Sequence, residues 1–204
     1  MSLTRQQVID AALNLVDAEG LDALTLRALA DRLGVQAPTL YWHVHNKSEL
    51  LDALADAILD DALAAIPTLD SEAEWGEWLL AALTGLRRAM LAHPDGARIV
   101  SGARQSLRRA DFSERAMATL VEHGVELQRA RMTLLVGERY TVGYALEEQA
   151  PAPEPGAQSP DPGELQRRLP TITSAIIEYF SSGRTADDLY RDGMRLILGE
   201  SSTS

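Results

Sequence analysis

Apolar residues recur at spacings of three and four along most of this chain, which is the pattern of helices that bury one face. The repeat is clear in residues 8–16, 50–59, 75–86 and 127–145, and it returns in residues 189–197. Turn-forming and polar residues separate these segments. The pattern predicts an all-α protein.

Capping signals mark the first helices. Thr4 and Gln7 have the spacing of a capping box, and the helix that they start is expected to end at Gly20. Asn46 and Glu49 have the same spacing and start a long helix that continues to about residue 65. The first helix is interpreted as a support and the long one as a rigid lever.

Between them the sequence predicts two short helices joined by a turn at Gly34. Thr25 caps the first short helix, and Pro38 stands in the first turn of the second, where a missing backbone N–H costs little. Two short helices around a glycine turn are typical of a helix-turn-helix, in which the second helix reads the major groove. DNA binding is therefore the first hypothesis.

The second short helix carries large aromatic residues. Thr39, Tyr41, Trp42 and His43 are expected to be exposed there, which is typical of a contact surface. The alternative is that Tyr41 and Trp42 are partly buried and that Gly34 only ends a helix. The flanking helices favour the contact surface.

Pro67 ends the long helix, and we place a domain boundary there. The expected parts are a helix-turn-helix domain at 1–46, a lever helix at 47–66 and a helical domain at 67–204. In the last domain, helices are expected to start at the caps 71–74 and 111–114, and to cover 126–149, 164–181 with a disturbance at Pro170, and 185–198. The Pro-rich segment 150–163 is predicted to be a flexible loop.

Composition sets wider bounds. A length of 204 residues with 46% hydrophobic residues allows a substantial core. The chain has no Cys, so disulfides and thiolate sites are excluded. No run is long and apolar enough for a membrane span, and the N-terminus lacks the order of a signal peptide. We expect a cytoplasmic protein without a membrane partner.

The net charge of −11 opposes DNA binding, because Lys and Arg neutralise phosphates. Only the field at the reading surface matters, however, and hydroxyls and helix N-termini also hold phosphates. An enzyme is not expected. The four His residues, at 43, 45, 93 and 123, form no recognised metal or nucleophile motif, and there is no Gly-rich phosphate loop. No catalytic residue, metal or cofactor is assigned.

Residues 4–60 resemble the DNA-binding domain of the tetracycline-repressor (TetR) family. The segment PTLYWHVHNKSELLDALA is close to the tetracycline repressors themselves, and a looser similarity continues through RRAMLAHPDGARIVSGAR at 87–104 and YTVGYALEEQ at 140–149. The resemblance implies a homodimer whose helix-turn-helix domains bind a palindromic double-stranded DNA operator. It also implies helical C-terminal domains that bind a small effector and form the dimer.

The resemblance also implies which residues bind DNA. Gln36 and Ala37 stand where the tetracycline repressors have a Glu and a Gln at the start of the reading helix. The residues that read bases therefore differ, while Pro38, Thr39, Tyr41, Trp42, His43 and Lys47 are the same. The implied DNA-binding residues are Thr25, Arg27, Gln36, Ala37, Pro38, Thr39, Tyr41, Trp42, His43 and Lys47.

The effector site departs further from the resemblance. The tetracycline repressors hold a magnesium–drug chelate with a His, a Thr and a Glu, which match Val100, Ala103 and Glu147. Polar drug contacts match Leu63, Ala82 and Ala116, and an aromatic wall residue matches Leu86. Mg²⁺ takes several oxygen or imidazole ligands and waters, and the apolar side chains at these positions cannot provide them. Tetracycline is therefore not the expected effector.

What remains is a more apolar pocket. Glu147 or Arg104 is expected to provide its polar group. The alternative for Glu147 is a solvent-exposed helix residue beside Glu148. The expected effector-binding residues are Leu63, Ala82, Leu86, Val100, Ala103, Arg104, Met117, Leu134 and Glu147. The predicted effector is a small, largely apolar molecule that releases a repressor from its operator.

The resemblance implies that the helices at 126–149 and 185–198 form the dimer core. Leu189, Met194 and Ile197 are the expected interface residues, and packing within one chain is the alternative. For the whole protein, the alternative function is a helical dimeric ligand-binding protein whose helix-turn-helix is inactive.

Overall fold

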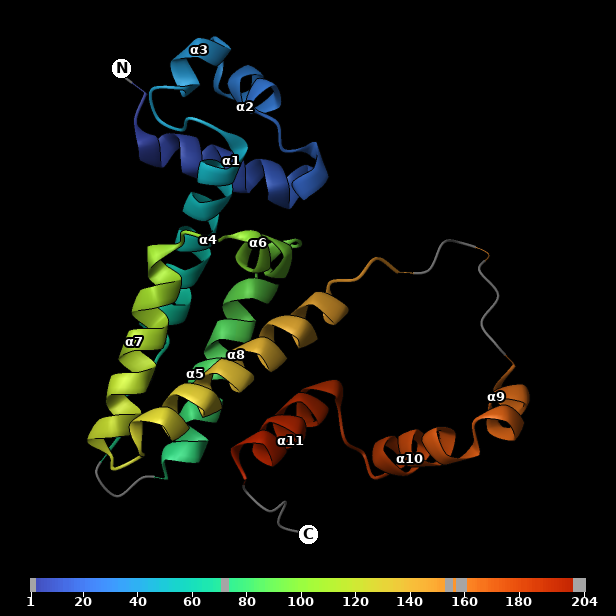
Figure 1. Cartoon of the computed structure of the whole chain (residues 1–204). Helices are drawn as coiled ribbons and strands as arrows, with labels where there is room; N and C mark the ends of the chain where they lie inside the picture. Colours follow the sequence, from blue (N-terminus) through green and yellow to red (C-terminus); the bar gives the residue numbers. More distant parts are fainter. Residues whose placement is uncertain (1–2, 71–73, 153–155, 157–160, 200–204) are drawn as a thin grey trace. The chain divides into compact units, whose positions relative to one another are not determined.

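The computed structural model describes residues 3–70, 74–152, 156 and 161–199. Every regular element in this part of the chain is helical, as Figure 1 shows, which confirms the all-α prediction. Contacts divide the chain into two units, residues 1–149 and 150–204, and each is described by itself.

Three helices and one helical turn form the N-terminal end of the first unit: α1 (Arg5–Glu19), the 3₁₀ turn η1 (Leu21–Ala23), α2 (Leu26–Leu33) and α3 (Ala37–Leu40). The capping box of Thr4 and Gln7 is present, and the Thr25 side chain accepts a hydrogen bond from the Ala28 N–H. Gly34 ends α2 with φ of 66°, the left-handed conformation that glycine adopts without strain. The predicted helix-turn-helix is confirmed.

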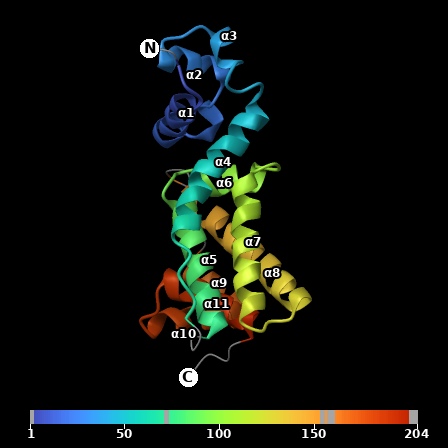
Figure 2. The same ribbon diagram turned by 90° about the vertical axis from the view of Figure 1, so that its left-hand side faces the viewer.

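The lever is helix α4 (Lys47–Ala64), which leaves the N-terminal helices and continues into the rest of the unit, as Figure 2 shows. Asn46 caps it by accepting from the Glu49 N–H. A capping box would also have the Glu49 carboxylate accept from the backbone N–H of Asn46. In the structure it accepts from the backbone N–H of His45 instead. The helix starts at the predicted Lys47 and ends at Ala64, two residues before the predicted limit of the lever.

Helices α5 (Trp75–Leu91), α6 (Gly96–Gly102), α7 (Leu107–Glu122) and α8 (Leu127–Glu148) pack with α4 around an apolar core. The expected caps at 71–73 lie outside the described residues. The expectation that α7 starts at Asp111 was wrong. It starts at Leu107, because the Ser106 side chain accepts from the Arg109 N–H and so caps the helix one turn earlier.

The second unit contains α9 (Pro162–Arg168), α10 (Pro170–Ser181) and α11 (Ala186–Leu198). Helix α9 begins inside the predicted flexible loop, because Asp161 caps it. Residues 153–155 and 157–160 of that loop lie outside the described residues. The predicted break at Pro170 is confirmed, as is the cap of the last helix by Thr185 and Asp188.

Candidate functional site

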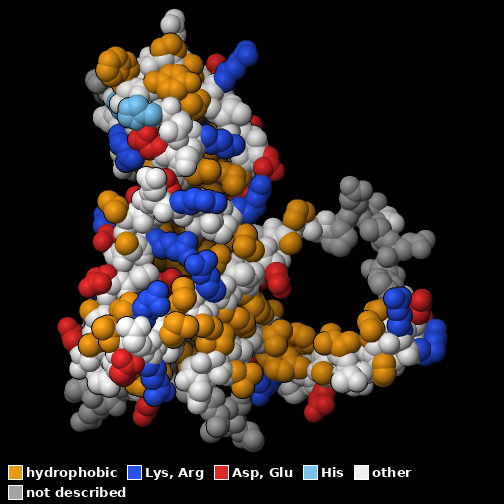
Figure 3. Space-filling view, in the orientation of Figure 1, with side chains coloured by type: hydrophobic (Ala, Val, Ile, Leu, Met, Phe, Trp, Pro, Cys, Tyr) orange, Lys and Arg blue, Asp and Glu red, His pale blue; other side chains and the backbone are white. Residues whose placement is uncertain are grey.

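The second short helix was expected to carry the large aromatic residues, but α3 ends at Leu40, and Tyr41 and Trp42 follow it on the surface. Trp42 is 86% exposed and Tyr41 51%, whereas Leu40 and Val44 are fully buried. The buried pair anchors α3 against the N-terminal core, so the residues between them face outward. Hydrophobic side chains are accordingly visible at the tip of the N-terminal helices in Figure 3. The structure thus favours a contact surface over the buried-aromatic alternative.

The other predicted DNA-binding residues differ in exposure. Arg27, Gln36, Pro38 and Lys47 are exposed, and Ala37, Thr39 and His43 are half-buried. Thr25 is also exposed, although its hydroxyl already caps α2. The exposed residues of α2, α3 and the start of α4 thus offer guanidinium, ammonium, amide and hydroxyl groups to solvent. These are the donors that contact phosphates and base edges.

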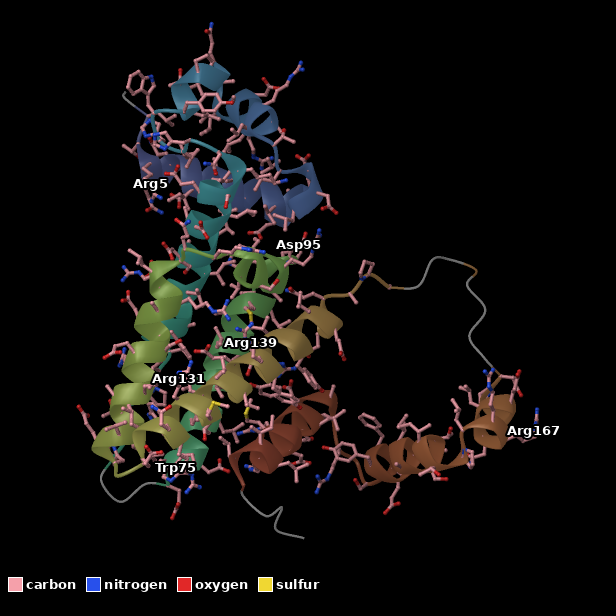
Figure 4. The ribbon with its side chains drawn as sticks, in the orientation of Figure 1. Arg5, Trp75, Asp95, Arg131, Arg139 and Arg167 are labelled. Atoms are coloured by element: carbon pink, nitrogen blue, oxygen red, sulfur yellow. The ribbon has the colours of Figure 1, made fainter. Side chains whose placement is uncertain are left out.

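A polar junction joins the N-terminal helices to α6. The Asp95 carboxylate accepts from the Leu21 N–H at 2.7 Å and from the Arg98 guanidinium at 2.8 Å. Arg98 also pairs with Asp22 at 2.8 Å, which lowers the pKa of Asp22 through hydrogen bonding and charge. Figure 4 shows Asp95 beside the N-terminal helices. Hydrogen bonds thus join the start of α6 directly to η1.

A stripe of carboxylates connects the lever to the loop between α6 and α7. Asp52 accepts from the backbone N–H groups of Arg104 and Gln105, at 2.9 and 3.1 Å. One turn on, Asp56 accepts from the Ser106 hydroxyl at 2.6 Å. A further turn on, Asp60 pairs with Arg108, so the stripe binds the α6–α7 loop and the start of α7 along two turns of α4.

Some predicted effector residues meet in space. Leu86 and Val100 line a small cavity, and Met117 and Leu134 line an adjoining cleft between α7 and α8. Sequence reasoning missed the other residues of the cavity. These are Leu59, Arg109, Phe112, Glu138 and Val142.

The remaining predicted effector residues line neither space. Ala82 and Ala103 are buried elsewhere in the core. Leu63 is half-buried, and its backbone carbonyl accepts from Arg115 at 3.1 Å. Arg104 and Glu147, the two expected polar groups, are exposed. None of these five residues lines the cavity or the cleft.

Glu138 is the polar group that both spaces share. It is 7% exposed, and the Ser113 hydroxyl donates to its Oε1 at 2.6 Å. Burial raises the pKa of the Glu138 carboxyl, against the opposing effects of the Ser113 hydrogen bond and the charges of Arg109 and Arg139. The signal was present in the sequence: Glu138 continues the apolar face of Ala130 and Leu134 at four-residue spacing.

A second buried charge, Arg87 of α5, pairs with the C-terminal end of α8. Arg87 is 5% exposed, and its Nε donates to Glu148 at 2.7 Å while its NH2 group contacts the other carboxylate oxygen. Its guanidinium also lies 5.4 Å from the centre of the Tyr144 ring. The adjacent Glu147, which the resemblance matched to a metal ligand, is exposed instead.

These features define a class of protein: an all-helical regulator with an N-terminal helix-turn-helix and a long helix, α4, that leads from it into a helical domain. Among the described residues, no three His, Asp or Glu side chains group in a way that could hold a metal ion. No helix in the same part of the chain is long and apolar enough to cross a membrane.

Comparisons with known proteins identify the family. The family described as "Bacterial regulatory proteins, tetR family" matches residues 8–54, and "Tetracyclin repressor-like, C-terminal domain" matches residues 67–199. The chain belongs to the TetR family. It is thus a DNA-binding transcriptional regulator and not an enzyme.

Individual relatives cover nearly the whole chain. The class A tetracycline repressor of transposon 1721 from Escherichia coli is 36% identical over 94% of this chain and 87% of its own length. A TetR variant from Acinetobacter baumannii in complex with minocycline has a TM-score of 0.72 at 32% identity, covering 97% and 95% of the two chains. BioQ with its double-stranded DNA operator has a TM-score of 0.64 at 29% identity, covering 85% and 96%.

Proposed function

We propose that this chain is a cytoplasmic homodimeric repressor that binds a palindromic operator through α2, α3 and the start of α4. The exposed tip carries the proposal, because Trp42 and Tyr41 lie on the surface while their neighbours anchor α3. BioQ, a relative by structure, is known with its double-stranded DNA operator. Selection of bound sites from random DNA by the purified protein tests it, and an inverted repeat is the expected product.

Release from the operator is proposed to start at the cavity between α4, α5, α6, α7 and α8. A bound ligand would displace the start of α7 and the loop before it. The lever would follow, because Asp52, Asp56 and Asp60 bind that segment. The two reading helices would then stand at the wrong separation for successive major grooves. A difference in ligand affinity of about 1 to 3 kcal/mol between the two states suffices.

The first prediction concerns Lys47, at the first turn of α4. Lys47→Ala should weaken binding to all selected sites alike, because one phosphate contact is lost. The slope of log affinity against log salt concentration should become shallower by about one unit. Changing Gln36 or Ala37 should instead alter the preferred sequence. Fluorescence anisotropy over a salt series measures both effects. A sequence-selective loss for Lys47→Ala would contradict its role as a phosphate contact.

The second prediction concerns the dimer. Met132 and Val136 lie one turn apart on α8 and are 51% and 44% exposed, and Leu189 on α11 is 39% exposed. Of the other two expected interface residues, Ile197 is half-buried and Met194 is buried. We therefore assign the interface to the exposed apolar residues of α8 and to Leu189.

Val136→Asp or Leu189→Asp should yield monomers in light scattering, because a charge would enter a buried interface. Operator affinity should fall with dimerisation, since two half-sites are engaged together. Leu107→Asp is the matched control, since Leu107 is 73% exposed on α7, away from the proposed interface. Dimers that persist in both test variants would place the interface elsewhere.

The third prediction concerns tetracycline. The cavity is lined by Leu86 and Val100 and holds one carboxylate, Glu138, which does not provide the several oxygen ligands that Mg²⁺ prefers. Calorimetry with tetracycline and magnesium should therefore show no tight, magnesium-dependent binding. Tight binding that a chelator abolishes would overturn the proposal of a metal-free, largely apolar effector.

A further inference from the structure

The groove between α7 and α8 carries charges that an apolar effector does not explain. Helix α7 contributes Arg109, Ser113 and Met117, which are four residues apart and so share one face. Helix α8 contributes Arg131 and Glu138. Figure 4 labels Arg131 and Arg139 on α8. Two guanidinium groups, from Arg109 and Arg131, thus line the spaces around a single carboxyl group.

The surroundings of Glu138 are otherwise apolar. Helices α4, α5 and α6 present Leu59, Leu86 and Val100 to the cavity, and none of these can titrate. Ser113 satisfies one carboxylate oxygen, and the other makes no hydrogen bond within the described part of the chain. The charged groups that act on Glu138 are Arg109 from α7 and Arg139 from α8.

Arg109 is the group that points to a ligand. It is half-buried and lines the cavity, yet its guanidinium makes no hydrogen bond or ion pair with any described residue. A half-buried guanidinium is stabilised by an acceptor, and an anion is the strongest acceptor for it. An amine would be attracted by Glu138 but repelled by both Arg109 and Arg131, so the charges around the two spaces favour an anion.

We propose that the effector is an apolar molecule with one anionic group, which Arg109 holds while Glu138 takes up a proton from solvent. The inference rests on the proposed effector function of this cavity. Two anions cannot share a desolvated space, so the one that can be protonated is neutralised. Burial, which already raises the pKa of Glu138, makes that proton uptake easier. The protonated carboxyl then donates a hydrogen bond to the ligand or to its neighbours.

A pair of fluorescent dyes tests the charge preference. 8-Anilinonaphthalene-1-sulfonate is an apolar anion, and N-phenyl-1-naphthylamine has the same frame without the charge. The full-length protein should bind the sulfonate about tenfold more tightly than the uncharged dye, and Arg109→Gln should remove that difference by weakening the sulfonate alone. Equal affinities in the unaltered protein would overturn the proposal.

Arg104→Gln is the matched control, because Arg104 is exposed and lies outside both spaces. It should leave both dye affinities unchanged. A loss of sulfonate binding equal to that of Arg109→Gln would show that general surface charge, and not the cavity, holds the anion.

The proton has its own test. Sulfonate affinity should fall as pH rises, because binding takes up a proton, and Glu138→Gln should bind the dye with little pH dependence. Uncharged-dye binding reports whether Glu138→Gln is folded. An unchanged pH profile in Glu138→Gln would contradict proton uptake by this residue.

Release of selected DNA is measured separately. If the dye results hold while the protein binds no DNA, the ligand inference stands and the repressor function fails. If DNA is released by uncharged molecules whose binding does not depend on Arg109, the repressor function stands and this inference fails.

Discussion

Glu148→Ala is expected to lower the free energy of unfolding by about 3 kcal/mol, because it removes the carboxylate that the buried Arg87 guanidinium contacts. Removing one partner of a buried ion pair costs more stability than the intact pair contributes, because the other charge stays buried. Urea unfolding followed by circular dichroism measures the change as a lower midpoint at an unchanged slope.

Glu147→Ala is the matched control for this experiment. Glu147 precedes Glu148 on the same helix and is exposed, so its loss should change stability by no more than about 0.5 kcal/mol. The two variants remove the same side chain one position apart, and helix propensity therefore cancels between them. Similar destabilisation by both would show that the Arg87 contact contributes little.

Gly96→Ala is expected to destabilise the first unit by about 3 kcal/mol. A Cβ at Gly96 would stand 2.0 Å from the backbone oxygen of Met90 and 2.9 Å from its carbonyl carbon. Because both are backbone atoms, the end of α5 and the start of α6 would have to separate. Asp95 would move with them, which should also weaken its hydrogen bond to the Leu21 N–H.

Gly102→Ala is the control within the same short helix. A Cβ there meets no atom within 4 Å, and alanine favours helix over glycine, so stability should stay unchanged or rise slightly. Thermal unfolding of the two variants gives the comparison. A Gly96→Ala protein as stable as Gly102→Ala would mean that α5 and α6 separate at little cost.

Local signals were predicted well because their partners are close in sequence. The capping boxes at Thr4 and Thr185 each join residues three positions apart, and both are present in the structure. Pro170 likewise breaks the helical segment where it was expected to do so. The start of α7 was misplaced because its cap, Ser106, is itself held by Asp56, which lies fifty residues earlier.

The lining of the cavity was predicted only in part. Leu86 and Val100 do line one cavity, but Glu147 and Arg104 are exposed, while Glu138 and Arg109 line the cavity. The resemblance to the tetracycline repressors supplied no counterpart for Glu138. The four-residue spacing from Leu134 did contain that signal, as a carboxylate on an otherwise apolar helix face.

The sequence by itself determined the helices, the turn at Gly34 and the outline of the helix-turn-helix, because caps, glycine conformation and apolar spacing act over a few residues. Only the tertiary structure decided which of two adjacent glutamates pairs with Arg87 and which charges enter the cavity. Those outcomes depend on how α5, α7 and α8 cross, and helix crossing brings together residues from distant parts of the chain.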